Sequence, residues 1–238
     1  MLDKLQKISV QVNLDRDYQA SSSLSTIWEY LSSNRLLEDL TLDDFEYPSG
    51  LPLSALLHLR WPVLKKFTLI RFGNGGDVAD SDALLEFVRA HPQIHALRID
   101  NWAPKPDSKY KPIPSIALPR LTSLHIHPNL LPVFHPADGI TSLAISRAHN
   151  FSKANDHDVI FASSRYSHIT HFEMITNGCQ AGGDGAEHYR SIYKALQQHF
   201  PRLEELRIRY HPWRGNSFHL VRLDSTFMWF SRRLPIGF

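Results

Sequence analysis

The chain has 238 residues, of which 42% are hydrophobic and 21% are charged, so it can bury a sizeable core and is not disordered by composition. Lys and Arg number 26 against 24 Asp and Glu, which gives a net charge of +2. This near balance argues against a dedicated nucleic-acid or membrane-surface protein, since such proteins usually carry a basic excess.

The cysteine content and the N-terminal segment bear on the compartment. Cys179 is the single cysteine, so an intrachain disulfide is ruled out and a reducing compartment is favoured. The segment MLDKLQKISV lacks a basic region followed by an apolar run, and no stretch approaches 18 uninterrupted apolar residues. We therefore predict a cytoplasmic or nuclear protein with no nucleic-acid or membrane partner.

A six-residue motif recurs along the chain, with apolar residues at its first, fourth and sixth positions. Chance alone would supply about six such motifs at this apolar content, so the bare motif is weak evidence. The copies begin 19 to 34 residues apart and read LQKISV (5–10), LEDLTL (37–42), LKKFTL (64–69), IHALRI (94–99), LTSLHI (121–126), ITSLAI (140–145), ITHFEM (169–174) and LEELRI (203–208).

Two further features strengthen the motif as a strand signal. A proline stands two residues before four of the copies, at Pro62, Pro92, Pro119 and Pro201. Because proline cannot continue a helix and biases the preceding residue toward extended geometry, it marks the start of a strand at the same point each time. The fifth motif position is small or polar in every copy, which is the alternation that a strand with one buried face requires.

Several of the gaps between motifs carry helical patterns of suitable length. Ser81 and Asp82 are predicted to cap one of these helices. The 19-residue interval between the fifth and sixth motifs leaves no room for a full helix, and the Pro-rich insert 103–118 is predicted to be a surface loop. The predicted helix faces are Leu24, Ile27, Trp28 and Leu31; Leu53, Leu56, Leu57 and Trp61; Leu84, Leu85 and Val88; and Tyr189, Ile192, Tyr193, Leu196 and Phe200.

Strand, turn, helix and strand at a period near 29 residues predict a right-handed coil with a parallel sheet on one side. The predicted fold class is α/β: an irregular leucine-rich-repeat-like solenoid, with a curved parallel sheet on the concave side and helices and loops on the convex side. We predict one domain over residues 1–238, built of about eight degenerate repeats, with 211–238 as a C-terminal cap. The repeats are degenerate because the Asn or Cys that normally follows the third apolar residue occurs in one copy alone, as Asn177.

The series LEDLTLDDF, WPVLKKFTLIRF, HPQIHALRIDNW, LPRLTSLHIHPN, ITSLAIS and FPRLEELRIRY resembles the repeat region of the F-box and leucine-rich-repeat-like proteins of mushroom-forming fungi, from about Leu36 to Tyr210. In that family an F-box docks to an adaptor of a ubiquitin ligase, and the repeats hold the substrate. No F-box pattern precedes the first motif here. The resemblance implies either the substrate-binding part of an F-box-type receptor or a free-standing protein-interaction scaffold with no ligase link. A ligase adaptor is an expected partner only if an F-box is supplied elsewhere.

The strand register predicts three columns of side chains that face solvent on the concave sheet. Acids gather at Asp39 and Asp43, and bases gather at Arg207 and Arg209. The columns are Lys7, Asp39, Lys66, Ala96, Ser123, Ser142, His171 and Glu205; Ser9, Thr41, Thr68, Arg98, His125, Ala144, Glu173 and Arg207; and Gln11, Asp43, Ile70, Asp100, His127, Ser146, Ile175 and Arg209.

Rigid curved faces with arginine and aromatic anchors suit protein recognition, so we predict a protein partner on the concave face. The predicted anchor is the patch of Arg207, Arg209, Tyr210 and Trp213. The full set of predicted partner-binding residues is Arg98, Asp100, His125, His127, Glu173, Arg207, Arg209, Tyr210 and Trp213.

No catalytic, metal or cofactor site is predicted. His125 and His127 share one strand face, but His171 lies two strands away, roughly 9–10 Å, whereas zinc needs ligands that converge at about 2 Å. The segment GCQAGGDGAEHYR lacks the Lys-Ser/Thr of a phosphate loop, and Cys179 has no recognisable histidine base. A metal-dependent or hydrolytic enzyme is the less favoured alternative.

Overall fold

The structure is a computed structural model that describes residues 6–11, 29–43, 59–70, 78–100, 116–134, 139–146, 167–177, 196, 198–211 and 220–224. Each of the eight motifs forms a strand, and each strand begins at the third residue of its motif. The strands are β1 (Lys7–Gln11), β2 (Asp39–Asp43), β3 (Lys66–Ile70), β4 (Ala96–Ile99), β5 (Ser123–Ile126), β6 (Ser142–Ile145), β7 (His171–Asn177) and β8 (Glu205–His211).

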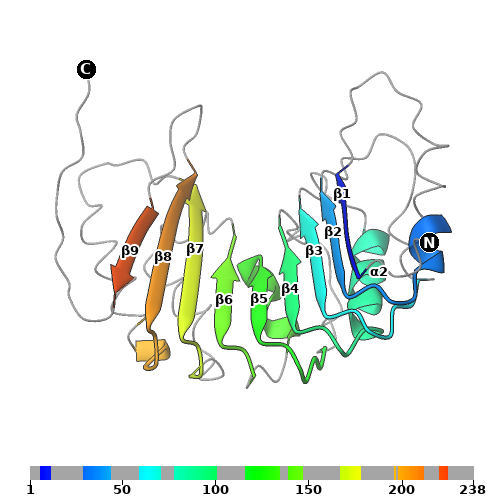
Figure 1. The fold of residues 1–238 in the computed structure, drawn as a ribbon. Coiled ribbons are helices and arrows are strands. Elements are labelled where there is room, and N and C mark those ends of the chain that lie inside the picture. Colours follow the sequence, from blue (N-terminus) through cyan, green and yellow to red (C-terminus); the bar gives the residue numbers. More distant parts are fainter. Residues whose placement is uncertain are drawn as a thin grey trace, which may run out of the picture.

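The strands form one sheet in which the order along the chain is also the order in space (Figure 1). β1 to β8 are all parallel, which confirms the predicted parallel sheet. A ninth strand, β9 (Leu220–Asp224), pairs antiparallel with β8 at the C-terminal edge of the sheet. It lies within the segment that the sequence predicts to be a cap.

One backbone contact recurs at every step from one motif to the next. The carbonyl of the second motif residue accepts hydrogen bonds from the N–H groups of the second and third residues of the following motif. For example, the Thr122 carbonyl accepts from Thr141 at 2.9 Å and from Ser142 at 3.0 Å, and the same pair of bonds occurs in all seven intervals. Gaps of 19 and 34 residues therefore join strands in the same register.

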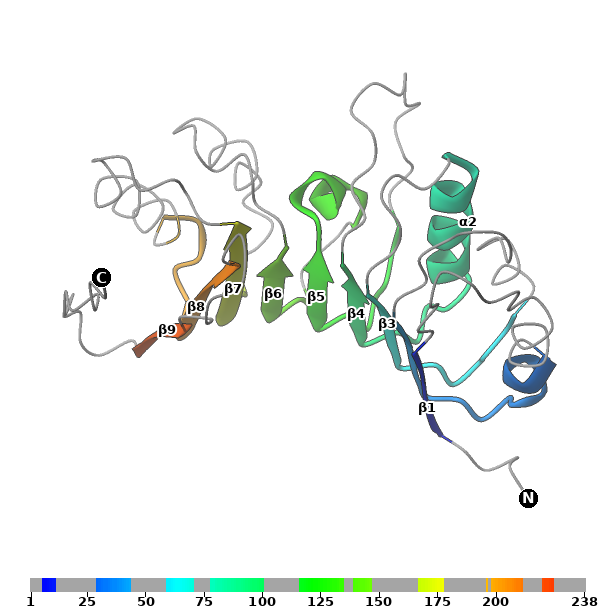
Figure 2. The same cartoon turned by 90° about the horizontal axis from the view of Figure 1, so that it is seen from above.

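The three apolar positions of each motif build the core. In β2 to β7 and the residues just before these strands, every one of these side chains is at most 3% exposed. Such burial stabilises the fold by roughly 1.5–3 kcal/mol per side chain. Figure 2 shows the strands following an arc, with the helices α2 (Val78–Arg89) and η2 (Pro128–Val133) on its convex side. The apolar positions face these helices, so the alternate strand positions face the concave side.

The helices agree with the sequence prediction in part. Leu84, Leu85 and Val88 are buried on α2, as predicted, and η2 is a short 3-10 helix in the 19-residue interval. Residues 29–33 are also helical. The predicted cap at Ser81 and Asp82 is wrong, because α2 begins at Val78 and both residues therefore lie inside the helix, within its first two turns.

Two other local predictions need correction. Trp61 was predicted on a helix face, but it is the first residue of a turn that ends at the start of the third motif. Its side chain is buried, as the pattern requires. The insert 103–118 is not wholly a surface loop. Its last residues, Ile116 and Leu118, are 1% and 5% exposed, and Ile116 forms a β-bridge with Phe134. Residues 53–58, 103–115 and 189–195 lie outside the described residues, as do Leu24, Ile27 and Trp28.

The four prolines occupy equivalent places in four equivalent turns. In each of these four motifs, the first residue donates its N–H to the carbonyl of the residue three positions earlier. The proline is therefore the second residue of a four-residue turn. Proline favours this position because its fixed φ suits the turn. The bonds are Leu64 to Trp61 at 3.0 Å, Ile94 to His91 at 3.2 Å, Leu121 to Leu118 at 3.0 Å and Leu203 to Phe200 at 3.1 Å.

The residues that open two of these turns join neighbouring repeats in the core. The His91 ring lies 2.7 Å from the Phe87 carbonyl through Nδ1, and its Nε2 accepts the Trp61 N–H at 3.1 Å. Trp61 in turn donates Nε1–H to the Leu31 carbonyl at 3.0 Å. Since Nε2 accepts a bond, Nδ1 carries the proton and the ring is neutral. Burial lowers the pKa of His91; the bond to Phe87 opposes this shift, and the charge of Arg60 adds to it.

Candidate functional site

The polar side of the sheet, which we call the concave face, consists of the three predicted columns. Strand pairing confirms the first two columns without a break, from Lys7 through Ser123 to Glu205 and from Ser9 through His125 to Arg207. The third column is paired at its two ends, through Gln11, Asp43 and Ile70 and through Ile175 and Arg209. The predicted register is therefore correct.

Three residues of these columns were predicted to face solvent and are instead buried: Thr68, Asp100 and Ser146, at 6%, 7% and 4% exposed. Thr68 is short and lies between Thr41 and Arg98 on the neighbouring strands. Asp100 is held down by ion pairs that are described below. Ser146 is also short and directly follows β6, and its hydroxyl has no hydrogen-bond partner among the described residues.

The buried Asp100 carboxylate binds two side chains of the face. Arg98, two residues earlier and on the same strand side, donates from Nε to Oδ2 at 2.8 Å and also from Nη2. His125 of β5 places Nε2 2.9 Å from Oδ1. Burial raises the pKa of Asp100, but His125 and Arg98 together outweigh it and bring the pKa below its usual value. Asp100 is therefore ionised at neutral pH and fixes both neighbours.

A second acid-centred cluster lies on the first strands. Asp39 of β2 is 3.5 Å from the Lys7 ammonium and 3.7 Å from the Lys66 ammonium, on the strands to either side. The side chain of Asp39 is 18% exposed, against 70% for Lys7 and 50% for Lys66. The carboxylate is recessed, and the two ammonium groups project further into solvent.

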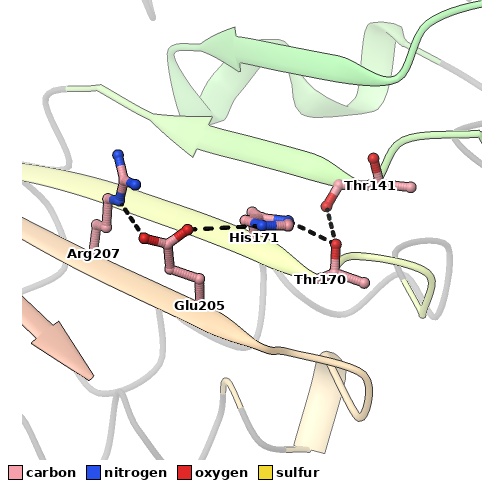
Figure 3. Close-up of polar contacts among 5 residues, drawn as sticks. All are labelled: Thr141, Thr170, His171, Glu205 and Arg207. Atoms are coloured by element: carbon pink, nitrogen blue, oxygen red, sulfur yellow. Dashed lines mark hydrogen bonds and ion pairs between the residues drawn. The ribbon is translucent and has the colours of Figure 1, made fainter. Parts of the chain in front are cut away.

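Figure 3 shows a third cluster, around Glu205 of β8. Arg207 donates from Nε to Glu205 Oε1 at 2.7 Å, and His171 of β7 places Nε2 3.7 Å from Oε2. The other ring nitrogen of His171 lies 2.7 Å from the Thr170 hydroxyl, which donates to the Thr141 carbonyl at 3.3 Å. The hydrogen bond that Arg207 donates to Glu205 and the negative charge of Glu205, with a smaller contribution from the charge of Glu173, raise the pKa of Arg207. The cluster thus ties the concave face to the hydrogen bonds that align the strands.

The three clusters share one arrangement. In each, a carboxylate with a side chain 10–18% exposed lies between two nitrogen bases from the same or neighbouring strands. The cationic side chains Lys7, Lys66, Arg98 and Arg207 are 41–70% exposed. Because the acids are recessed and the cations project, the cationic groups are the more accessible charges at these three clusters.

Between the clusters the face has a floor of short side chains, which are Ala96, Ser123, Ser142 and Ala144. Two shallow hollows lie over it. One, of about 390 Å³, extends from Thr41 and Lys66 to Glu173, and the other, of about 230 Å³, extends from Ser142 to Arg207. They share Ser142, Ala144 and Glu173, so together they form one trough across the strands.

The predicted partner-binding residues are only partly brought together. Arg98, Asp100 and His125 form one cluster, and Glu173 lies beside Arg207 in register. His127 follows β5 and is half-buried. The predicted anchor is described only for Arg207: Arg209 and Tyr210 are backbone positions of β8 whose side chains lie outside the described residues, as does the whole of Trp213.

The sequence prediction missed the clusters around Asp39 and Glu205 as units. Their signal was present in the first column, where an acid stands between two lysines and where His171 is followed by Glu205. It missed Thr170 because that residue precedes its strand. Among the described residues, no group of three or more His, Cys, Asp or Glu side chains is arranged to hold a metal ion. In the same part of the chain, no helix is long and apolar enough to cross a membrane.

Comparisons with protein-family models, with curated proteins and with solved structures give no match to this chain. The resemblance to F-box and leucine-rich-repeat-like proteins therefore stays a prediction.

Proposed function

We propose that the chain is a leucine-rich-repeat-like solenoid that binds a protein partner on its concave face and catalyses no reaction. The observation that carries the proposal is the trough of short side chains, bordered by fixed charged clusters, that crosses β3 to β8. The hollows are shallow, and side chains of several neighbouring strands line each of them. Preorganised charged groups around a shallow surface give specificity in protein association.

Repeat stacks suit this role because each strand adds one row to a continuous surface. On this chain the rows keep register over eight strands, so side chains far apart in sequence, such as Lys66 and Glu173, border one trough. The pairing of each exposed cation with a recessed acid holds the cation in place before a partner arrives. Less side-chain entropy is then lost on binding.

Two versions of the role remain distinct. In one, the chain is the substrate-binding part of an F-box-type ubiquitin-ligase receptor; in the other, it is a scaffold with no ligase link. Co-purification of a ligase adaptor with the natural protein from its source cells supports the first version. Capture of the partner without an adaptor supports the second.

The test compares affinity capture from a cell lysate by three forms of the chain: the wild type, Ser142→Trp in the trough and Glu86→Trp on α2. The proposal predicts a protein that the wild type and Glu86→Trp retain and Ser142→Trp loses. The captured protein is then purified, and its affinity for Ser142→Trp is expected to be weaker by at least about tenfold. Equal affinity for the three forms, with intact folds, contradicts the proposal.

A further inference from the structure

The two halves of the trough differ in charge. Around the larger hollow, Lys66 and Arg98 supply two cations, and Glu173 is the one acid, at the far end. Around the smaller hollow, Glu173 and Glu205 supply two acids against the single cation of Arg207. Of the charged side chains that line the trough, those over β3 and β4 are cations and those over β7 and β8 are mainly acids, while Asp39 and Asp100 lie recessed beside the two cations.

Lys66 and Arg98 present two exposed positive charges at the end of the trough over β3 and β4. Arg98 donates from two nitrogens to Asp100, so its guanidinium is fixed, yet its side chain remains 44% exposed. Lys66 is 50% exposed and shares Asp39 with Lys7. A guanidinium beside an ammonium suits a carboxylate, because the planar guanidinium sets the direction of its hydrogen bonds and the ammonium adds a second positive charge.

The floor between the two ends lets a main chain come close. Ser123 of β5 and Ser142 and Ala144 of β6 have short side chains, and they lie between Arg98 and Glu173. β4 and β7 are three strand steps apart, which is about 14 Å at about 4.8 Å per step. An extended chain rises about 3.3 Å per residue, so about four residues cover this distance.

We propose that the partner lays an extended segment across the trough, with an acidic side chain over Lys66 and Arg98 and a basic side chain over Glu173 about four residues away. This inference rests on the proposed function, since it names the partner segment that the same face binds. Opposite charges at matched spacing fix the direction of the segment, and a segment of one charge sign meets repulsion at one end.

The test uses a phage-displayed library of random ten-residue peptides, selected on the full chain. We expect the enriched peptides to carry an acid and a base three to five residues apart. Synthetic copies are then titrated against variants by fluorescence anisotropy. Lys66→Ala plus Arg98→Ala is expected to weaken binding on the order of tenfold, and Glu173→Gln severalfold.

A matched control removes one lysine and one arginine elsewhere. Lys65→Ala plus Arg89→Ala changes the net charge by the same amount at similar exposure, 52% and 37%, outside the trough. This control is expected to stay within about twofold of the wild type. Because loss of Arg98 removes one partner of the buried Asp100, Lys66→Ala alone serves as a second variant that leaves that ion pair intact.

The outcomes separate the inference from the proposed function. In one outcome, Ser142→Trp blocks peptide binding, but neither the cation variants nor Glu173→Gln change the affinity. This result overturns the charge arrangement and leaves the concave face as the binding surface. Selected peptides of one charge sign overturn it as well. Peptides that bind Ser142→Trp as well as the wild type, or a selection that enriches none, count against the proposed function itself.

Discussion

His91 and Asp100 are titratable side chains that the fold buries with partners. His91 accepts the Trp61 N–H and bonds the Phe87 carbonyl, and Asp100 pairs with Arg98 and His125. A buried polar group without such partners would cost stability. The two differ in role, because His91 lies in the core among aromatic rings, whereas Asp100 positions side chains of the concave face.

His91→Phe is expected to lower the free energy of unfolding by about 1–3 kcal/mol at pH 7.5, because the buried Trp61 N–H loses its acceptor. The pKa of His91 is lowered from 6.5 in the folded state. The unfolded chain therefore takes up this proton first as pH falls below 6.5, and the wild type loses stability that the variant does not lose. Urea unfolding at pH 7.5 and 5.5 checks that the difference in the free energy of unfolding between the wild type and His91→Phe is smaller at pH 5.5. The exposed His168→Phe is the control, and a difference that grows at pH 5.5 contradicts the neutral ring.

Asp100→Asn is expected to destabilise the fold by about 1–3 kcal/mol at pH 7, because Arg98 and His125 lose a charged partner. The folded pKa of Asp100 is lowered, so its stabilisation is fully present above the unfolded value of 3.8 and is lost as pH falls through the folded pKa. Urea unfolding at pH 7 and at pH 3 measures both effects. Glu204→Gln, at an exposed position, is expected to leave the free energy of unfolding unchanged at both pH 7 and pH 3. A penalty for Asp100→Asn that persists unchanged at pH 3 would rule out the ionised carboxylate as its source.

At the scale of elements, the strands were predictable and several other features were not. All eight motifs became strands in the expected register, because apolar alternation decides which side of a strand is buried. The start of α2 was predicted four or five residues late, because a cap at Ser81 or Asp82 precedes the first helical residue, whereas α2 begins at Val78. Serine and aspartate near a helix start resemble caps even when they lie within the first turns. The burial of Asp100 was not predictable from alternation alone, because it depends on contacts of its carboxylate with Arg98 and with His125 of the next strand.

The proline turns supply a prediction at this scale. Pro92→Ala is expected to lower the free energy of unfolding by about 0.4–1 kcal/mol, because alanine fits the turn but gives the unfolded chain more freedom. Thermal unfolding of the variant measures the loss. Gln93→Ala in the same turn leaves the proline in place and is expected to have no measurable effect. A Pro92→Ala protein as stable as the wild type would mean that the proline does not restrict the unfolded chain at this turn.

For the molecule as a whole, sequential strand order means that each strand contacts mainly its two neighbours in the sheet. The apolar side chains of the central strands are almost fully buried, whereas Ile8 and Val10 of β1 are only partly buried. Stability is then expected to be spread unevenly, with its weakest packing at the N-terminal edge of the described sheet.

Paired truncations test this distribution. Leu124→Ala in β5 is expected to cost about 2–5 kcal/mol, because it leaves a cavity in the packed centre. Ile8→Ala in β1 is expected to cost about 1 kcal/mol, since part of that side chain already contacts water. Urea unfolding of both variants supplies the comparison. Equal costs would contradict the expected weakness at β1.

The concave face was predicted from the sequence as columns of side chains but not as a charge pattern. Which residues share the face follows from the motif, so Arg98, His125, Glu173 and Arg207 were identified correctly as its members. Which acids are recessed and which cations project depends on side-chain pairing across strands, as around Asp39. The columns place such residues side by side, but the depth of each side chain does not follow from the motif.

The most direct test of the concave face as the binding surface is photocrosslinking to the partner obtained by affinity capture. A photoreactive phenylalanine analogue replaces Ser123 on the floor of the trough in one form and Glu86 on α2 in another. If the concave face binds the partner, irradiation crosslinks it to position 123 and not to position 86. A partner that binds with undiminished affinity and crosslinks only to position 86 would contradict the assignment of the concave face.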